Sequence, residues 1–239
     1  MEKLEKFQIL VSCLIITFGL LIATLIFASK ISKDENITVT GSASKIVKSD
    51  SAKLSFTVRS RKTNQKETFA NLKIQIPKVV EYLKSKGIKE IDIKAMDGYS
   101  VFRQNDKGYS TNEIIGYEGS QLIEIKSNDV LKIKEISTDI QSLIDKGINI
   151  EVYSPQYFYS DLASIKIDLL KEASLDAKQR ANSMLEATGA NVGKVKSMRM
   201  GVFQITPVDS TMVSDMGIND TSSIDKKVTA VANVVFKVK

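Results

Sequence analysis

Histidine and tryptophan are absent from this chain of 239 residues, and cysteine occurs once, at Cys13. Without histidine there is no Ser-His-Asp triad, no imidazole metal ligand and no histidine pH switch. A single cysteine excludes an intrachain disulfide, a CxxC redox pair and a cysteine metal cluster. These absences favour a structural or binding protein over an enzyme, and we expect neither a cofactor nor a metal.

The excess of positive over negative charge is also small. The chain has 34 lysines and arginines against 28 acidic residues, a net charge of +6. The basic residues are spread along the sequence, which indicates a solvated surface and not the clustered footprint of a nucleic-acid-binding protein. No nucleic-acid partner is therefore expected.

The longest uncharged run is residues 7–29, which follow a short tail at residues 1–6. As a helix rising ~1.5 Å per residue, the stretch Phe7–Phe27 spans about 31 Å, which matches a hydrocarbon core of ~30 Å. A backbone in lipid must satisfy its own hydrogen bonds, and a helix does so. The run therefore predicts a transmembrane helix. The expected anchor residues are Phe7, Leu10, Leu14, Phe18, Leu21, Leu25 and Phe27.

A cleaved signal peptide is the alternative for this segment. Its apolar region would span only ~7–15 residues, which is shorter than the observed run. Ile26 and Ala28 could nevertheless occupy the −3 and −1 positions of a weak cleavage site. Two lysines flank each end of the run, so the positive-inside rule leaves the orientation open.

Period-two alternation predicts strands beyond a linker at residues 30–35. It is clearest at Leu54, Phe56 and Val58, and again in the final segment 228–238. The glycine-containing polar segment 97–112 predicts a hairpin turn. Further strands are expected at residues 37–40, 91–96, 115–126, 148–160 with a break or bulge at Pro155, and 192–205.

Helical periodicity predicts three helices, the first capped by Asn64 and kinked or interrupted at Pro77. The second is expected to be capped by Asn128, and the third spans Asp161–Thr188 with an alanine-rich stripe. The first two end at a Lys-Gly-Ile sequence, which suggests two related β–α–β units. The expected fold is α+β, with mixed, largely antiparallel sheets and two to three long helices after the transmembrane helix. The ectodomain is residues 36–239.

Two groups of side chains are candidates for an interface. Aromatic residues cluster before the third helix, and methionines lie in the polar loop 206–226. Aromatics anchor many interfaces, although half-buried strand packing gives the same pattern. Carboxylates four apart at Asp168, Glu172 and Asp176 suggest cation binding or acid–base chemistry, but a solvated helix face explains them more simply. The candidate interface residues are Tyr153, Tyr157, Phe158, Tyr159, Met212 and Met216.

Several passages occur in a distinctive order. They are ITVTGSASKIVKSDSAKLSFTV, LKSKGIKEIDIKAMDGYSVF, IIGYEGSQLIEI, EASLDAKQRANSMLEATGANVGKVKSM and DTSSID. Over about Ile37–Val238 this order resembles the SIMPL-domain family of bacterial envelope proteins. Lys48-Ser49 replaces a proline that is frequent in the family, and the tyrosine-rich YSPQYFYS replaces a plainer strand.

The resemblance implies an extracytoplasmic protein without established catalytic activity. Bacterial members are linked to oxidative-stress protection, and some form ring- or channel-like oligomers. We therefore expect a membrane-anchored, non-enzymatic protein of the cell envelope that self-assembles into a homo-oligomer. The alternative is a monomeric tethered module that binds an envelope peptide, protein or lipid. The expected partners are membrane lipid and further copies of the chain. The expected location is the bacterial inner membrane, single-pass, with the ectodomain outside the cytoplasm.

Overall fold

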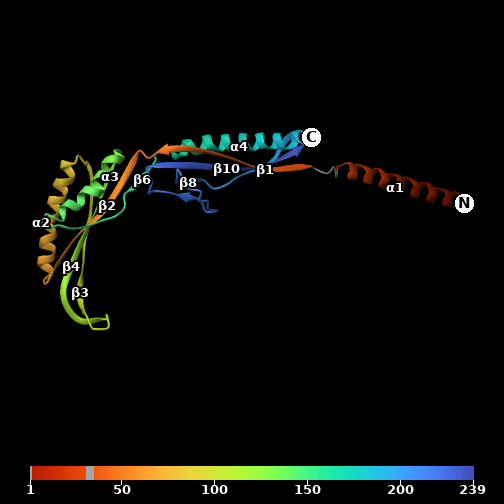
Figure 1. The fold of residues 1–239 in the computed structure, drawn as a ribbon. Helices are drawn as coiled ribbons and strands as arrows, with labels where there is room; N and C mark the ends of the chain where they lie inside the picture. Colours follow the sequence, from red (N-terminus) through yellow and green to blue (C-terminus); the bar gives the residue numbers. More distant parts are fainter. Residues whose placement is uncertain (1, 31–34) are drawn as a thin grey trace. The chain divides into compact units, whose positions relative to one another are not determined.

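The computed structural model has an α+β fold with mixed, largely antiparallel sheets (Figure 1). It describes the backbone of residues 2–30 and 35–239, and the side chains of residues 11, 12, 14–26 and 35–239. Two compact units make up the chain. The first contains residues 1–42, 172–201 and 231–239, and the second contains residues 43–171 and 202–230.

The described elements follow one another as four α-helices, one 3-10 helix and ten strands. In chain order they are α1 (Glu2–Lys30), β1 (Asn36–Lys48), β2 (Ser51–Lys62), α2 (Gln65–Ser85), β3 (Glu90–Gln104), β4 (Ser110–Ser127), α3 (Val130–Asp139), η1 (Ile140–Leu143), β5 (Asn149–Val152), β6 (Gln156–Phe158), α4 (Leu162–Glu186), β7 (Val192–Met200), β8 (Gln204–Pro207), β9 (Ile218–Asn219) and β10 (Asp225–Val238).

The second unit is built on a sheet in the order β3-β4-β2-β5, with β6 also paired to β2. The predicted alternation on β2 is confirmed, because Leu54, Phe56 and Val58 are completely buried. Ile123 and Ile125 stand opposite Phe56 and Leu54 on β4. These side chains, with those of α2 and α3, form the main hydrophobic core. Full burial of one such side chain contributes about 1.5–3 kcal/mol.

The opposite face of this sheet carries ion pairs. Arg59 on β2 contacts Glu151 at 2.6 Å and Glu118 at 3.0 Å, and Lys53 contacts Glu124 at 2.5 Å. Hydrogen bonds from Glu151 and then Glu118 raise the pKa of Arg59. A face with this charge pattern is solvated, as expected for an antiparallel sheet with one dry side.

Helix α2 begins where the sequence predicts. The Asn64 side chain accepts hydrogen bonds from the backbone amides two and three residues further on, at 2.8 and 3.3 Å. The predicted interruption at Pro77 is wrong, because α2 continues through it to Ser85. Pro77 is exposed, whereas Ile76 and Val79 pack into the core. Burial of the apolar stripe therefore outweighs the backbone hydrogen bond that proline removes.

Helix α3 starts one residue later than predicted. Asp129, and not Asn128, is the N-cap, and its carboxylate accepts the Lys132 amide at 3.0 Å. A capping side chain accepts an amide two or three residues further on, and Asp129 lies three residues before Lys132.

The Lys-Gly-Ile sequence at Gly87 ends α2 as predicted, whereas the one at Gly147 closes the turn after η1, since α3 already ends at Asp139. Gly87 and Gly147 adopt φ values of 79° and 75°. Each following isoleucine donates its amide to a carbonyl in the last helical turn, from Ile88 at 3.0 Å and from Ile148 at 3.1 Å. This is the Schellman arrangement, which needs a residue that tolerates positive φ. Both isoleucines are buried, so each stop also anchors the next strand.

The hairpin turn predicted within residues 97–112 is confirmed at residues 105–109, and the rest of that segment belongs to β3 and β4. There the Asn105 side chain accepts the amides of Lys107 and Tyr109, both at 3.0 Å. Residues 192–205 form two strands, β7 and β8, and not one. The predicted break near Pro155 is confirmed, because it separates β5 from β6.

The first unit packs α4 on strands that include parts of β1, β7 and β10. The alanine stripe at Ala173, Ala177 and Ala181 is completely buried. The backbone of Gly41 on β1 lies so close to α4 that a β-carbon there would be 2.1 Å from the Ala173 carbonyl oxygen. Alternation on β10 is confirmed by buried Val234 and by its neighbours on the same face. Strand β10 pairs with β7 and also belongs to the order β1-β10-β8-β9.

Helix α1 runs from Glu2 to Lys30. Among the side chains that the structure describes, no helix has an apolar stretch long enough to cross a membrane. Four residues of the predicted linker, 31–34, lie outside the described part of the chain.

Candidate functional site

The predicted aromatic cluster is divided between two faces of its strand. Tyr157 on β6 is buried in the core, whereas the next residue, Phe158, is 39% exposed. Tyr153 is also exposed, and its hydroxyl lies 3.3 Å from the Thr57 hydroxyl on the solvated sheet face. Tyr159 is half-buried. The four aromatics therefore do not form one surface, because successive residues of a strand point to opposite sides.

The methionine loop presents apolar side chains to solvent. Met212, Val213 and Met216 are 72%, 83% and 93% exposed. The loop is nevertheless held at its base, because the buried Gln204 side chain donates to the Ser214 carbonyl at 2.7 Å and accepts its amide at 3.3 Å. These contacts fix the loop while its tip stays open.

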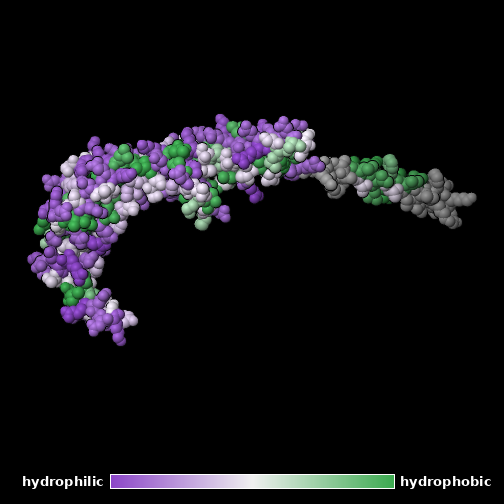
Figure 2. Space-filling model, in the orientation of Figure 1, coloured by the Kyte–Doolittle hydropathy of each residue, from purple (hydrophilic) through white to green (hydrophobic). Residues whose placement is uncertain are grey.

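The described side chains of α1 are exposed all round the helix. Leu14, Phe18, Leu21 and Leu25 are each at least 59% exposed. Figure 2 shows the described part of this helix as an almost continuous hydrophobic surface. The remaining predicted anchor side chains lie outside the described residues; they are Phe7, Leu10 and Phe27.

A further apolar surface lies on the β3–β4 hairpin, around the turn that the sequence predicts. Pairing between β2 and β4 stops at Tyr117, so residues 100–116 form a two-stranded ribbon, here called the arm. The arm extends beyond the end of α2 (Figure 1). Phe102 and Ile114 face each other across it and are 42% and 47% exposed. Tyr109 at the turn is 69% exposed.

The apolar character of the arm continues on its second face. Ile115, next to Ile114 in β4, is 39% exposed. An isolated two-stranded ribbon is marginally stable in water, and apolar side chains on both faces gain stability when a partner covers them. The charges on the arm balance: Arg103 pairs with Glu113 at 2.9 Å, and Lys107 offsets Asp106. A second arm would therefore meet no net repulsion.

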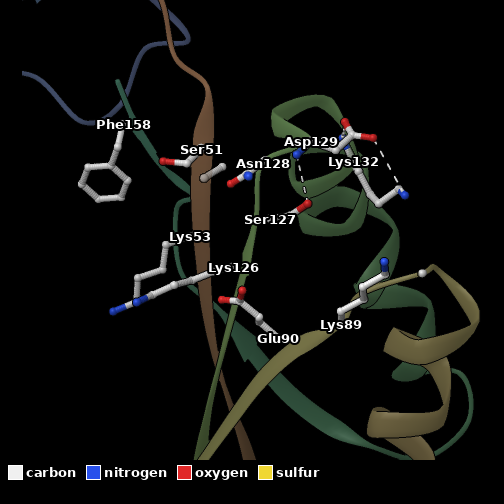
Figure 3. Close-up of a pocket in the computed structure, with 12 residues that line it drawn as sticks. Ser51, Lys53, Lys89, Glu90, Lys126, Ser127, Asn128, Asp129, Lys132 and Phe158 are labelled. Atoms are coloured by element: carbon white, nitrogen blue, oxygen red, sulfur yellow. Dashed lines mark hydrogen bonds and ion pairs between the residues drawn. The ribbon is translucent and has the colours of Figure 1, made fainter. Parts of the chain in front are cut away.

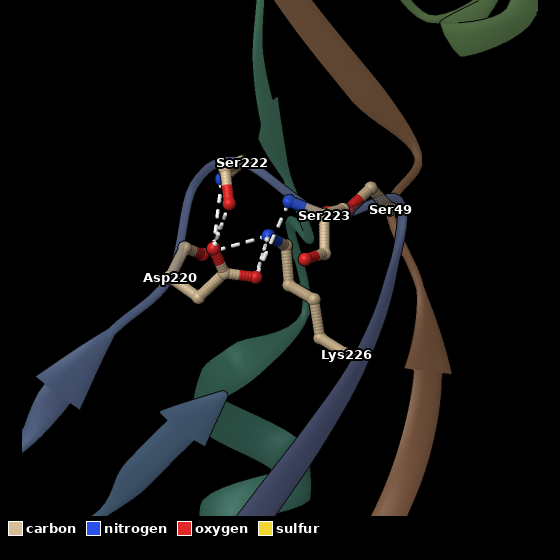
Figure 4. Close-up of polar contacts among 5 residues, drawn as sticks. All are labelled: Ser49, Asp220, Ser222, Ser223 and Lys226. Atoms are coloured by element: carbon tan, nitrogen blue, oxygen red, sulfur yellow. Dashed lines mark hydrogen bonds and ion pairs between the residues drawn. The ribbon is translucent and has the colours of Figure 1, made fainter. Parts of the chain in front are cut away.

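A buried ion pair lies at the start of β10 (Figure 4). The side chains of Lys226 and Asp220 are 3% and 7% exposed, and the Lys226 ammonium donates to the Asp220 carboxylate at 3.4 Å and to its carbonyl oxygen at 2.6 Å. The carboxylate also accepts the Ser222 hydroxyl at 2.7 Å and the amides of Ser222 and Ser223. We call this group the clasp.

The electrostatics of the clasp indicate a structural role. Burial alone would raise the pKa of Asp220, but the hydrogen bonds from Ser222 and Ser223 and the Lys226 charge outweigh it and hold the pKa at about 2. Burial lowers the pKa of Lys226, and the carboxylate partly offsets this. An ammonium that already donates to a carboxylate has no lone pair with which to activate a serine.

The carboxylates of α4 differ in their contacts and do not form one site. Asp176 accepts the Ser42 amide of β1 at 2.8 Å and the Arg180 side chain at 2.8 Å. The Ser42 amide first, and then Arg180, lower the pKa of Asp176. Asp168 and Glu172 are exposed. Across the described residues, no three histidine, cysteine or acidic side chains gather as a metal site would require.

A basic cavity of about 680 Å³ lies in the second unit (Figure 3). Lysines line it from β2, β4, α3 and the loop after α2, and Phe158 lines the side next to β2. Sequence reasoning missed this cavity, because its lysines are far apart in the chain. The residues that carry its charge are Lys53, Lys89, Lys126 and Lys132, against Glu90 and Asp129.

Comparison with known families gives one match. The sequence profile of the SIMPL family, described as a protein of unknown function (DUF541), matches residues 37–236. Comparison with curated proteins gives no match. The matched span begins in β1 and ends in β10, so it includes the arm, the clasp and the basic cavity.

Proposed function

This chain belongs to the SIMPL family, and we propose that it is a membrane-anchored, non-enzymatic protein of the bacterial cell envelope that self-assembles into a homo-oligomer. In this proposal α1 lies in the inner membrane and the folded part lies outside the cytoplasm. The oligomer would be ring- or channel-like, with a place in envelope or oxidative-stress protection.

The single observation that carries self-assembly is the uncovered arm. Phe102 and Ile114 form a cross-strand apolar pair on a ribbon to which no third strand pairs among the described residues. The other broad face of the sheet is occupied by charge pairs such as Arg59–Glu118, so it is a poor contact surface. A neutral, apolar, projecting arm suits contact with a neighbouring copy of the same chain, and a head-to-tail contact between the arm and a different surface of that copy can close a ring.

Membrane anchoring is supported by the exposed apolar side chains of α1. A helix that is hydrophobic all round is covered by protein core or by lipid. Phe18 and Leu20, which lie about 160° apart around the helix, are 68% and 60% exposed. Lipid would cover both. Anchoring in one plane would also raise the effective concentration of copies, so weak arm contacts would suffice for assembly.

The absence of catalysis is supported by composition and by the clasp. The chain has no histidine, and its buried lysine, Lys226, donates to a carboxylate and not to a serine hydroxyl. Its most deeply buried charges are therefore used to fasten the start of β10.

The experiment that tests this proposal is the native mass of the full-length protein in mild detergent, beside that of residues 31–239. The proposal expects a defined oligomer in both samples, because the contacts lie outside α1. Monomers in both would contradict it.

Monomers would favour the alternative, a tethered binding module for an envelope peptide, protein or lipid. The observation in its favour is the ordered methionine loop, which Gln204 holds while Met216 stays 93% exposed. Met212→Ser/Val213→Ser/Met216→Ser, which leaves Asp220 and Ser222 of the clasp in place, should then abolish capture of envelope partners. Unchanged capture would exclude this role for the loop.

We also propose that two related β–α–β units underlie the second unit. The support is the matching helix stops at Gly87 and Gly147, each followed by a buried isoleucine and a strand. The test is to exchange the segments that flank the Lys-Gly-Ile sequences at Gly87 and Gly147. A chimaera that still folds would support the equivalence, and a misfolded chimaera would contradict it.

A further inference from the structure

Strand β1 lies at one end of its sheet. In the described part of the chain it pairs with β10 alone, so the opposite edge of β1 has no neighbouring strand. Helix α4 runs along β1 (Figure 1), and the Ser42 amide of β1 donates to the Asp176 side chain of α4 at 2.8 Å. The Ser42 amide therefore points away from β10, and the Asp176 carboxylate occupies the place that a further strand would take.

The same edge of β1 is open at the residues before Ser42. Backbone groups of a strand alternate between its two edges, so Thr38 and Thr40 present their N–H and C=O groups to the same side as Ser42. Outside the pairing with β10, the described residues provide no hydrogen bond to the backbone of Thr38 or Thr40. Two consecutive outward-facing positions are therefore available to a further strand.

One row of α4 side chains borders this open edge. Asp176, Arg180 and Met184 are four residues apart, so ~6 Å separates each from the next along the helix. Alternate residues of a strand lie ~6.6–6.8 Å apart, which is nearly the same spacing. Each outward-facing position of β1 therefore has one member of the row beside it. Beyond the Ser42–Asp176 contact, that member is first a cation and then an apolar side chain.

The strand edge and the helix row line a groove of about 620 Å³ in the first unit. Thr38 and Thr40 line it from β1, and Arg180 and Met184 line it from α4. The Arg180 side chain is 54% exposed, and among the described residues its one ion pair is the contact from Nε to Asp176 at 2.8 Å. The terminal guanidinium nitrogens remain for a ligand, and a carboxylate fits their paired donors. Met184 is 55% exposed and offers an apolar contact beside them.

We propose that this groove binds an extended peptide segment of another protein, which adds to β1 as a further strand. Main-chain hydrogen bonds to Thr38 and Thr40 supply the affinity, as in other cases of strand addition. Two peptide side chains, two residues apart, contact α4: an acidic one at Arg180 and an apolar one at Met184. The groove is separate from the arm and the methionine loop, because every residue that lines it belongs to the first unit. The proposal therefore does not depend on self-assembly.

The test is fluorescence polarisation of a labelled peptide with the full-length protein in mild detergent. The probe is Thr-Glu-Thr-Leu-Thr with both ends blocked, and its reverse, Thr-Leu-Thr-Glu-Thr, covers the opposite strand direction. We expect saturable binding of one of the two and slower hydrogen exchange of residues 37–41 in the complex. The same probe with every backbone nitrogen methylated should not bind. Absence of binding by both probes, or equal binding of the methylated probe, would overturn the proposal.

A matched pair of variants tests the acidic contact. R180Q should weaken binding of the glutamate probe about fivefold, the upper end for an exposed ion pair, and should not change binding of a probe with glutamine in that position. R199Q removes the same charge from an exposed position on β7 of the same unit and should leave both affinities unchanged. Both variants keep the Ser42–Asp176 hydrogen bond. Equal weakening by R180Q and R199Q, or no effect of R180Q, would overturn the assignment of Arg180.

Discussion

Gly41 on β1 and Ala173 on α4 are in such close contact that a β-carbon on the glycine would stand 2.1 Å from the alanine carbonyl oxygen. Neither partner of this contact has a flexible end that could move away. The glycine of the VTGSAS sequence is therefore required by packing, and the alanine stripe of α4 is its complement.

We expect Gly41→Ala to destabilise the protein by about 3 kcal/mol, because strand and helix backbones must separate. Urea unfolding followed by circular dichroism measures this. Gly201→Ala is the control: its β-carbon would meet Val231 at 3.4 Å, an ordinary contact, and should cost less than about 1 kcal/mol. Equal effects of the two substitutions would contradict the close approach.

The clasp predicts an acid-sensitive stability. The pKa of Asp220 is lowered in the fold to about 2, from 3.8, so its stabilisation is complete above pH 3.8 and is lost as the pH falls through about 2. The difference corresponds to about 2 kcal/mol. Asp220→Asn should flatten the pH dependence of unfolding free energy between pH 4 and 2. An unchanged slope in the variant would assign the acid sensitivity to other carboxylates.

Gln204 is expected to control the methionine loop. Gln204→Ala removes both hydrogen bonds to the Ser214 backbone, which hold the base of the loop. We expect faster hydrogen exchange across residues 208–217 and faster peroxide oxidation of Met212, with little change elsewhere. The measurement is exchange followed by mass spectrometry. Unaltered exchange in that segment would show that other contacts hold the loop.

The anchor proposal predicts the effect of charge in α1. Phe18→Lys with Leu21→Lys should release the protein from membranes, since each lysine at a helix centre costs about 2.5–3.5 kcal/mol in lipid. Carbonate extraction of membranes measures retention. Leu131→Lys with Ile144→Lys alters exposed apolar residues outside α1 and should leave the protein in the pellet. Retention of both variants would contradict anchoring by α1.

Much of the core could be predicted from the periodicity of the sequence, because the signals for it are local. Leu54, Phe56 and Val58 alternate on a strand with one dry face, and the glycine stops carry their own conformational requirement. Lys226 follows the same alternation, because it lies on the inward side of β10 together with Val228. This position in the pattern was the one sequence signal that the lysine is buried.

The arm could not be predicted from its own sequence. Segment 97–112 is polar and contains two glycines, which resembles a loop. Its strand character depends on pairing with β4, where Gly98 faces Gly119 and packs against Phe69. Strand formation of this kind is set by neighbours across the sheet.

The most direct test of self-assembly through the arm is the native mass of Phe102→Ser/Ile114→Ser in mild detergent. Leu131→Ser/Ile144→Ser is the matched control, because it removes two apolar side chains that are at least as exposed from other surfaces of the same unit. We predict an oligomer for the wild type and the control, and a monomer for the arm variant. An arm variant that keeps the wild-type mass would contradict this account.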